Sequence, residues 1–205
     1  MIVSAQQTIP AISPVQIVQH RQDLDAIKLD GVEGVIWDRP IPHAIIPALN
    51  DWTIGMGEDV RQCMQPDQVE AFAASVFEAW GGLADIAKQW LAADIAQLAR
   101  HLANILSAPR IQLRIERVTD NACRKFHKDM VRARMICTYA GPGTQFGYSA
   151  GDGAQPAHAE TVATGAPILL KGKRWPLAPT GHVLHRSPPI EHLNLTRLVI
   201  VIDEA

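Results

Sequence analysis

The segment "RIQLRIERV", residues 110–118, alternates apolar and polar side chains, so that Ile111, Leu113 and Ile115 share one side. A period of two is typical of a β-strand with one buried face. Apolar residues upstream of Pro109 recur instead at spacings of three and four. The sequence therefore predicts helices before this segment and a β-rich structure from it onward.

The first predicted helix covers residues 66–80. Asp67 and Glu70 form a D-x-x-E pattern, which favours a helix start of the capping-box kind. Apolar residues then recur on one helical face, up to Trp80. Gly81 follows, and glycine commonly ends helices.

The second predicted helix covers residues 83–107. Its apolar stripe consists of Leu91, Ile95, Leu98, Leu102 and Ile105. This spacing is typical of an amphipathic helix, and we expect the two helices to pack as a hairpin over an apolar surface. Asp94, Gln97 and His101 lie beside the stripe, where we expect a solvated or boundary face.

Four further segments read as short strands, and they are separated by turns rich in glycine and proline: "VRARMICTY", "PILLKG", "HVLHRS" and "RLVIVID". Such a series without long intervening helices favours an antiparallel sandwich or barrel.

Residues 1–60 contain prolines and short extended pieces such as "GVIWDRPIP". We therefore predict an α+β fold. Residues 1–109 form an extended and helical region, residues 110–205 form a β core, and the two make one integrated domain.

The composition is that of an ordinary globular protein, with 205 residues, 47% hydrophobic and 20% charged. A net charge of −2 provides no basic field for nucleic acid. Three cysteines are too few and too scattered for a disulfide framework. The start, "MIVSAQQTIPAISPVQIVQ", lacks the features of a signal peptide, and no apolar run approaches a membrane span. We expect a soluble, cytoplasmic protein; homo-oligomerisation stays open.

The strongest chemical signal is the H-x-D pair of His127 and Asp129 in "KFHKD". Residues two apart on a strand point to the same side, so both side chains could bind one metal ion. His185, at the end of "HVLH", is the candidate third ligand. Two histidines and one carboxylate form the facial triad of non-haem Fe(II) sites. His182 would face elsewhere, and His192 lies in a loop.

Arg197 begins the last predicted strand, in which both faces are apolar. A buried guanidinium is costly unless an anion or a carboxylate accompanies it. Its partner is either a structural Asp or Glu or the carboxylate of a cosubstrate, and both readings stay open.

Other features give weaker signals. A thiolate zinc site is conceivable from Cys123, His127 and Cys137, although no C-x-x-C pair exists. Lys171, Lys173 and Arg174 form a small basic cluster that we expect to be solvated. The polar loop 147–161 has the composition of a lid, and we expect His158 within it to be a surface residue.

Two resemblances extend this reading. The segments "VTDNACRKFHKD…VRARMICTYAGPGTQ" and "LLKGKRWP…HVLHRSPPIE…TRLVIVID" resemble the bacterial DUF1826 family, which has no assigned activity. More widely, the order of H-x-D, a strand ending in Tyr139, G-x-T-x-F, a distal His and a closing Arg is similar to the prolyl-hydroxylase-like 2-oxoglutarate oxygenases.

This wider resemblance implies a C-terminal double-stranded β-helix, of the jelly-roll or cupin-like kind. It also implies that His127, Asp129 and His185 bind Fe(II), and that Arg197 and Tyr139 bind the far carboxylate of 2-oxoglutarate. The sequence departs from the pattern in a longer gap before Arg197 and in lacking the usual glycine ahead of it.

Two alternatives remain. The first is a cupin-like protein that binds zinc or another metal without 2-oxoglutarate chemistry. The second is a degenerate β-helix that uses its pocket or its helical face only to bind another protein, with the stripe at 91–105 as a candidate contact. The substrate of an oxygenase is not indicated by the sequence.

Overall fold

The computed structural model describes residues 13–52, 57–151, 154–176 and 181–205. Most of the stretch examined for a signal peptide, and residues 152–153 of the predicted lid loop, therefore lie outside the described residues. The helical elements are η1 (Arg21–Lys28), α1 (Ile46–Asp51), η2 (Pro66–Gln68), α2 (Val69–Trp80) and α3 (Asp85–Leu106). The strands are β1 (Val15–Val18), β2 (Gly34–Trp37), β3 (Val60–Met64), β4 (Ile111–Val118), β5 (Ala133–Ala140), β6 (Gln145–Tyr148), β7 (Glu160–Thr161), β8 (Pro167–Lys171), β9 (Val183–Arg186) and β10 (Arg197–Glu204).

A seven-stranded sheet with the order β1-β2-β8-β5-β10-β4-β3 forms the main layer. Only β1 and β2 pair in parallel; the other neighbours are antiparallel. The strands predicted after Pro109 are present. The region before it, for which we expected helices and irregular extended pieces, also supplies β1, β2 and β3 to this sheet. The edges of the sheet therefore come from the N-terminal part of the chain.

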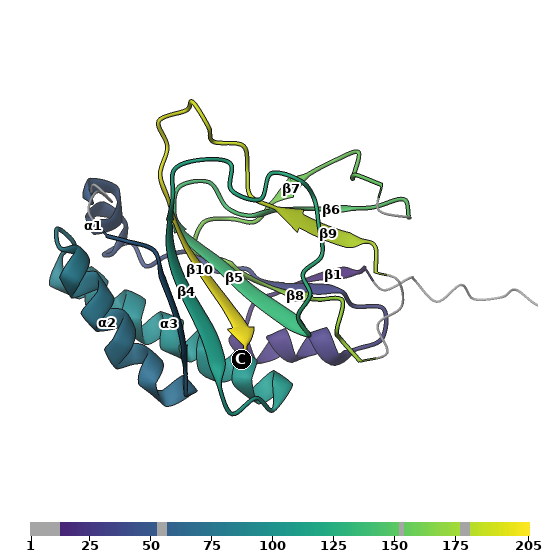
Figure 1. The fold of residues 1–205 in the computed structure, drawn as a ribbon, viewed down its shortest axis with the longest axis horizontal. Coiled ribbons are helices and arrows are strands. Elements are labelled where there is room, and N and C mark those ends of the chain that lie inside the picture. Colours follow the sequence, from purple (N-terminus) through teal and green to yellow (C-terminus); the bar gives the residue numbers. More distant parts are fainter. Residues whose placement is uncertain (1–12, 53–56, 152–153, 177–180) are drawn as a thin grey trace, which may run out of the picture.

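A small sheet with the order β7-β6-β9 lies over one face of the main sheet (Figure 1). The layer between the sheets contains Phe146 and Val183 from the small sheet, and Ile136, Val199 and Val201 from the main sheet. Strand β10 buries side chains on both faces, as its sequence predicts. The result is a two-layered β structure with an apolar interior.

Helices α2 and α3 cover the opposite face of the main sheet (Figure 1). Both predicted helices are confirmed, and α3 ends where Ser107 adopts a left-handed conformation with φ 50°. Leu91, Ile95, Leu98 and Leu102 are fully buried in the core beneath. The alternative that this stripe binds another protein is therefore wrong, because the main sheet already covers it.

Two local predictions about these helices need correction. The capping box upstream of α2 is made by Gln65 and Gln68 around the 3-10 turn η2, not by Asp67 and Glu70. Asp94 is not solvated: it is 6% exposed and forms a bidentate ion pair with Arg39, with N–O distances of 2.5 and 2.6 Å. None of the helices in the described part of the chain combines the length and hydrophobicity needed to cross a bilayer.

Candidate metal centre

His127 and His185 are joined by a backbone bridge. The amide of each residue donates to the carbonyl of the other at 3.0 Å, which attaches His127 to the free side of β9. Asp129 follows in the loop that leads to β5. The H-x-D pair is thus carried by a loop and not by a strand, so strand alternation was the wrong reason for expecting the two side chains together.

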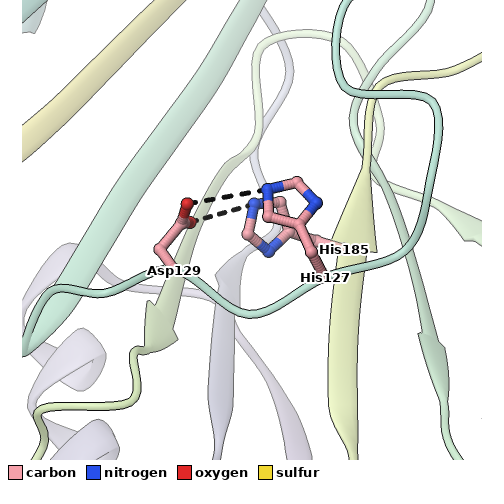
Figure 2. A group of neighbouring side chains, drawn as sticks. All are labelled: His127, Asp129 and His185. Atoms are coloured by element: carbon pink, nitrogen blue, oxygen red, sulfur yellow. Dashed lines mark ion pairs between the residues drawn. The ribbon is translucent and has the colours of Figure 1, made fainter. Parts of the chain in front are cut away.

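The two imidazoles and the carboxylate nevertheless converge (Figure 2). His185 Nε2 lies 3.1 Å from Asp129 Oδ2, and His127 Nε2 lies 3.6 Å from Asp129 Oδ1. One candidate ligand atom from each residue lies within 4.8 Å of the other two. His185 is 6% exposed and the other two are partly buried. The loop and β9 therefore bring together the three residues that the sequence singled out.

The hydrogen bonds of the site suit a metal ion. His127 Nδ1 lies 2.9 Å from the Lys125 carbonyl, which can only accept, so in the neutral imidazole Nδ1 carries the proton and Nε2 presents a lone pair. Asp129 Oδ2 is buried without a hydrogen-bond partner of proper geometry. Lone pairs of nitrogen and oxygen that face each other repel unless a proton or a cation lies between them. The donor set of two imidazoles and one carboxylate fits Fe(II) and also zinc.

Arg134 holds the carboxylate of Asp129 in place. Its Nη1 donates to Asp129 Oδ1 at 2.5 Å, while Nε and Nη2 donate to Asp203 at 2.7 Å. Burial alone would raise the pKa of Asp129, but the adjacent imidazoles of His127 and His185 and the charge of Arg134 hold that pKa well below its usual range. Asp129 is therefore ionised at neutral pH and oriented before any ligand binds.

The two histidines have opposite electrostatic surroundings. The adjacent carboxylate of Asp129 raises the pKa of His127, although partial burial opposes it. Burial lowers the pKa of His185, against the effect of the same carboxylate. In the metal-free protein, a proton is therefore held more readily by His127 than by His185.

Arg197 lies in the same pocket as His127 and His185, at the start of β10. It is 1% exposed, and Nε donates to the Pro142 carbonyl at 2.7 Å. Nη1 and Nη2 lie 3.3 Å from the hydroxyls of Ser187 and Thr138. Within the described residues no carboxylate forms an ion pair with it, and burial lowers its pKa to about 10, with only a distant opposing effect of Glu116.

The sequence matches the family described as "protein of unknown function (DUF1826)" over residues 19–203. The chain belongs to the DUF1826 family. No curated protein matches the sequence.

Several solved structures resemble the DUF1826 chain. A candidate oxygenase from Shewanella oneidensis aligns with a TM-score of 0.52 and 12% identity, covering 94% of this chain and 90% of that one. The rice dioxygenase for auxin oxidation gives 0.48 and 12%, covering 94% and 83%. A Pseudomonas putida prolyl-4-hydroxylase gives 0.44 and 16%, covering 89% and 96%. At these identities the likeness concerns the fold alone. The predicted α+β fold with a double-stranded β-helix is confirmed.

Tyr139 does not fit the role that the resemblance implied. It alternates with Thr138 on β5, and its side chain lies in the core between the main sheet and α3, away from the pocket of Arg197. Its hydroxyl donates to Asp94. The expected hydrogen bond from Tyr139 to a cosubstrate is therefore incompatible with this DUF1826 structure, and Thr138 takes the position beside the guanidinium.

Among the weaker candidates, Cys123 lines the same pocket as His127 and His185. Cys137 lies under the helices, with Sγ directed at the Gly165 carbonyl, so it does not join Cys123 and His127. Lys171 is 8% exposed and donates to the Leu29 carbonyl, which corrects the expectation that it is solvated. His158, His182 and His192 are exposed at the surface.

Sequence reasoning missed two residues that organise the site. Arg134 carried a usable signal, because it is the one charged residue in the mostly apolar strand β5. Glu33, which contacts Lys128 and the start of β9, carried none, since it lies in an irregular stretch far away in the sequence.

Proposed function

We propose that this DUF1826 protein is an Fe(II)- and 2-oxoglutarate-dependent oxygenase, with His127, Asp129 and His185 as the metal ligands. The observation that carries the proposal is the position of two of the candidate ligands beside Arg197. His127 and His185, which converge with Asp129, line the same pocket as a buried guanidinium that has no acidic partner among the described residues. An Fe(II)-binding triad beside an anion-binding group is what an oxygenase with a dicarboxylate cosubstrate requires.

The residues of the chain would have distinct roles. Arg197 would form an ion pair with the carboxylate of 2-oxoglutarate far from the metal, and the hydroxyls of Ser187 and Thr138 would donate to the same group. Arg134 would keep Asp129 ionised and oriented. Ile136, Val199 and Val201 line the pocket with apolar surface and would exclude water from the reacting groups.

When bound, Fe(II) would supply the coordination positions and the redox chemistry by which one oxygen atom of O2 enters a C–H bond and the other enters succinate, with loss of CO2. The ligand residues His127, Asp129 and His185 would occupy one face of the ion, which leaves the remaining positions open.

Anaerobic titration of the metal-free protein tests the proposal. We expect one equivalent of Fe(II) or Mn(II) to bind, and 2-oxoglutarate to bind by calorimetry only after the metal. Slow conversion of 2-oxoglutarate to succinate under air should depend on Fe(II). Asp129→Ala should lose metal binding, whereas His182→Ala, which changes an exposed histidine nearby, should keep it. Equal metal content in wild-type protein and Asp129→Ala would refute the site.

The second candidate function is metal binding without 2-oxoglutarate, with Zn(II) or another ion on the same three residues. The observation that favours it is that Nε, Nη1 and Nη2 of Arg197 all have polar partners inside the chain, so a structural role suffices for them. Elemental analysis of protein made without added metal, followed by calorimetry with 2-oxoglutarate, separates the two functions.

A further inference from the structure

Glu33 is a buried carboxylate that the proposed chemistry does not use. It lies immediately before β2 in the N-terminal part of the chain and is 8% exposed. A buried charge is retained only where hydrogen bonds and opposite charges compensate its lost hydration. The partners of Glu33 therefore indicate what it holds together.

The first partner is Lys128, the residue between the two candidate ligands His127 and Asp129. Lys128 Nζ donates to Glu33 Oε2 at 3.0 Å, and both side chains are nearly buried. Because this ion pair is shielded from water, it constrains the backbone of the H-x-D loop more than a surface pair would.

The remaining partners are at the start of β9. The His182 amide donates to Glu33 Oε1 at 2.9 Å, and the Val183 amide donates to Oε2 at 3.0 Å. Val183 and His185 both point inward from this strand. One carboxylate thus contacts both chain segments that supply metal ligands, at one end of the antiparallel His127–His185 bridge.

The contact leaves no space for a side chain at Gly181. A Cβ atom built there would lie 1.9 Å from Lys128 Nζ and 2.2 Å from Glu33 Oε2. A side chain at Gly181 would therefore have to displace the ends of the Lys128 and Glu33 side chains.

We propose that Glu33 is a positioning residue for the metal centre: it fixes the H-x-D loop and the start of β9 relative to each other, so that the three ligand atoms converge. The inference rests on the proposed function for the identity of the centre. It assigns to the N-terminal part of the chain a role in metal affinity that its distance in sequence does not suggest.

Two isosteric variants of the full-length chain test the inference. Glu33→Gln removes the charge and one acceptor. Asp94→Asn is the matched control, because Asp94 is also a buried carboxylate with three side-chain hydrogen bonds, from Arg39 and Tyr139, on the opposite face of the sheet. The measurements are hydrogen exchange of the metal-free proteins by mass spectrometry and Co(II) titration by visible absorption.

We expect Glu33→Gln to exchange faster in residues 125–129 and 181–186 and to bind Co(II) about tenfold more weakly, as for other groups that orient metal ligands. Asp94→Asn should lower the melting temperature without changing Co(II) affinity. Unchanged exchange in those two segments, or a dissociation constant within about twofold of wild type, would overturn the inference.

Lys128→Met keeps the inference testable if Glu33→Gln does not fold. It removes the ammonium but leaves both amide hydrogen bonds to Glu33, so we expect a smaller loss of Co(II) affinity; wild-type affinity would overturn the inference. If the wild-type protein binds no Co(II), the proposed function fails, and the exchange rates of the metal-free variants alone decide whether Glu33 joins the two segments.

Discussion

His127 and His185 pair through two reciprocal backbone hydrogen bonds of 3.0 Å, which bring their imidazole centroids to 4.5 Å. The pairing extends the small sheet by a single residue beyond β9. The two histidines are therefore brought together by a main-chain bridge at the free side of a strand, which does not involve their side chains. We accordingly expect each histidine to be replaceable without loss of the fold.

His185→Ala should abolish tight metal binding. Removing one of three ligands should weaken Mn(II) or Co(II) binding by more than about a hundredfold. The reason is that loss of a residue that only hydrogen-bonds a ligand already weakens metal binding by up to about a hundredfold. Calorimetry or equilibrium dialysis measures this, and circular dichroism checks the fold. His182→Ala is the control, since His182 is exposed and precedes the same strand. Retained affinity in His185→Ala would exclude His185 as a ligand.

Arg197→Met should separate cosubstrate binding from metal binding. The variant keeps an unbranched buried chain but removes the guanidinium, so we expect Mn(II) affinity to be retained and metal-dependent 2-oxoglutarate binding to be lost. Because Arg197 has no acidic partner within the described residues, we expect a change in unfolding free energy of only about 1 kcal/mol.

Arg114→Met is the comparison for that experiment. Arg114 lines the same pocket but already lies 3.3 Å from Glu116, so its removal should reduce 2-oxoglutarate binding far less. Calorimetry in the presence of Mn(II) measures both variants. If Arg197→Met bound 2-oxoglutarate as the wild type does, Arg197 would have a structural role. A site elsewhere for 2-oxoglutarate, or metal binding without 2-oxoglutarate chemistry, would then be favoured.

Tyr139→Phe should affect stability and not the site. The lost hydroxyl donates to the buried, ionised pair of Asp94 and Arg39, and a hydrogen bond to a charged group contributes about 1.5–3 kcal/mol. Urea unfolding should show a decrease of that order, with metal and 2-oxoglutarate affinities unchanged. A selective loss of 2-oxoglutarate affinity would restore the role that the family resemblance implied.

The stability contributed by Glu33 should depend on pH. Burial alone would raise the pKa of Glu33, but hydrogen bonds from the amides of His182 and Val183 and from Lys128 hold it below its ordinary value of 4.5. A carboxyl whose pKa is lowered on folding stabilises the protein above its unfolded-state pKa, and this contribution disappears as the pH falls through the folded-state pKa.

Urea unfolding of the wild type and Glu33→Gln at about pH 7, about pH 5 and about pH 4 measures this contribution. The difference in unfolding free energy should be full at the two higher values and should shrink at the lowest. A difference that stays constant, or that grows with acidification, would show that Glu33 is not ionised in the folded protein.

Local patterns in the sequence determined the type and position of several helices and strands of this protein. The period of two in β4 and the period of 3.6 in α3 follow from which faces must be buried, so they are visible in the sequence itself. Strand β10 is apolar on both faces, and the charged Arg197 at its start was conspicuous for the same reason. His127, Asp129 and His185 could be selected because few other residue types bind metals.

Only the tertiary structure decided which residues meet across the layers. Tyr139 and Thr138 are neighbours in sequence, yet one faces α3 and the other faces Arg197, and only the packing of the sheet fixes which face the helices cover. Asp94 is polar and borders an apolar stripe, but the Arg39 guanidinium that compensates its charge comes from a distant loop. Glu33 has no local pattern at all. Its three hydrogen bonds with Lys128, His182 and Val183 form because the folded chain brings these residues together, and the periodicity of the sequence does not show it.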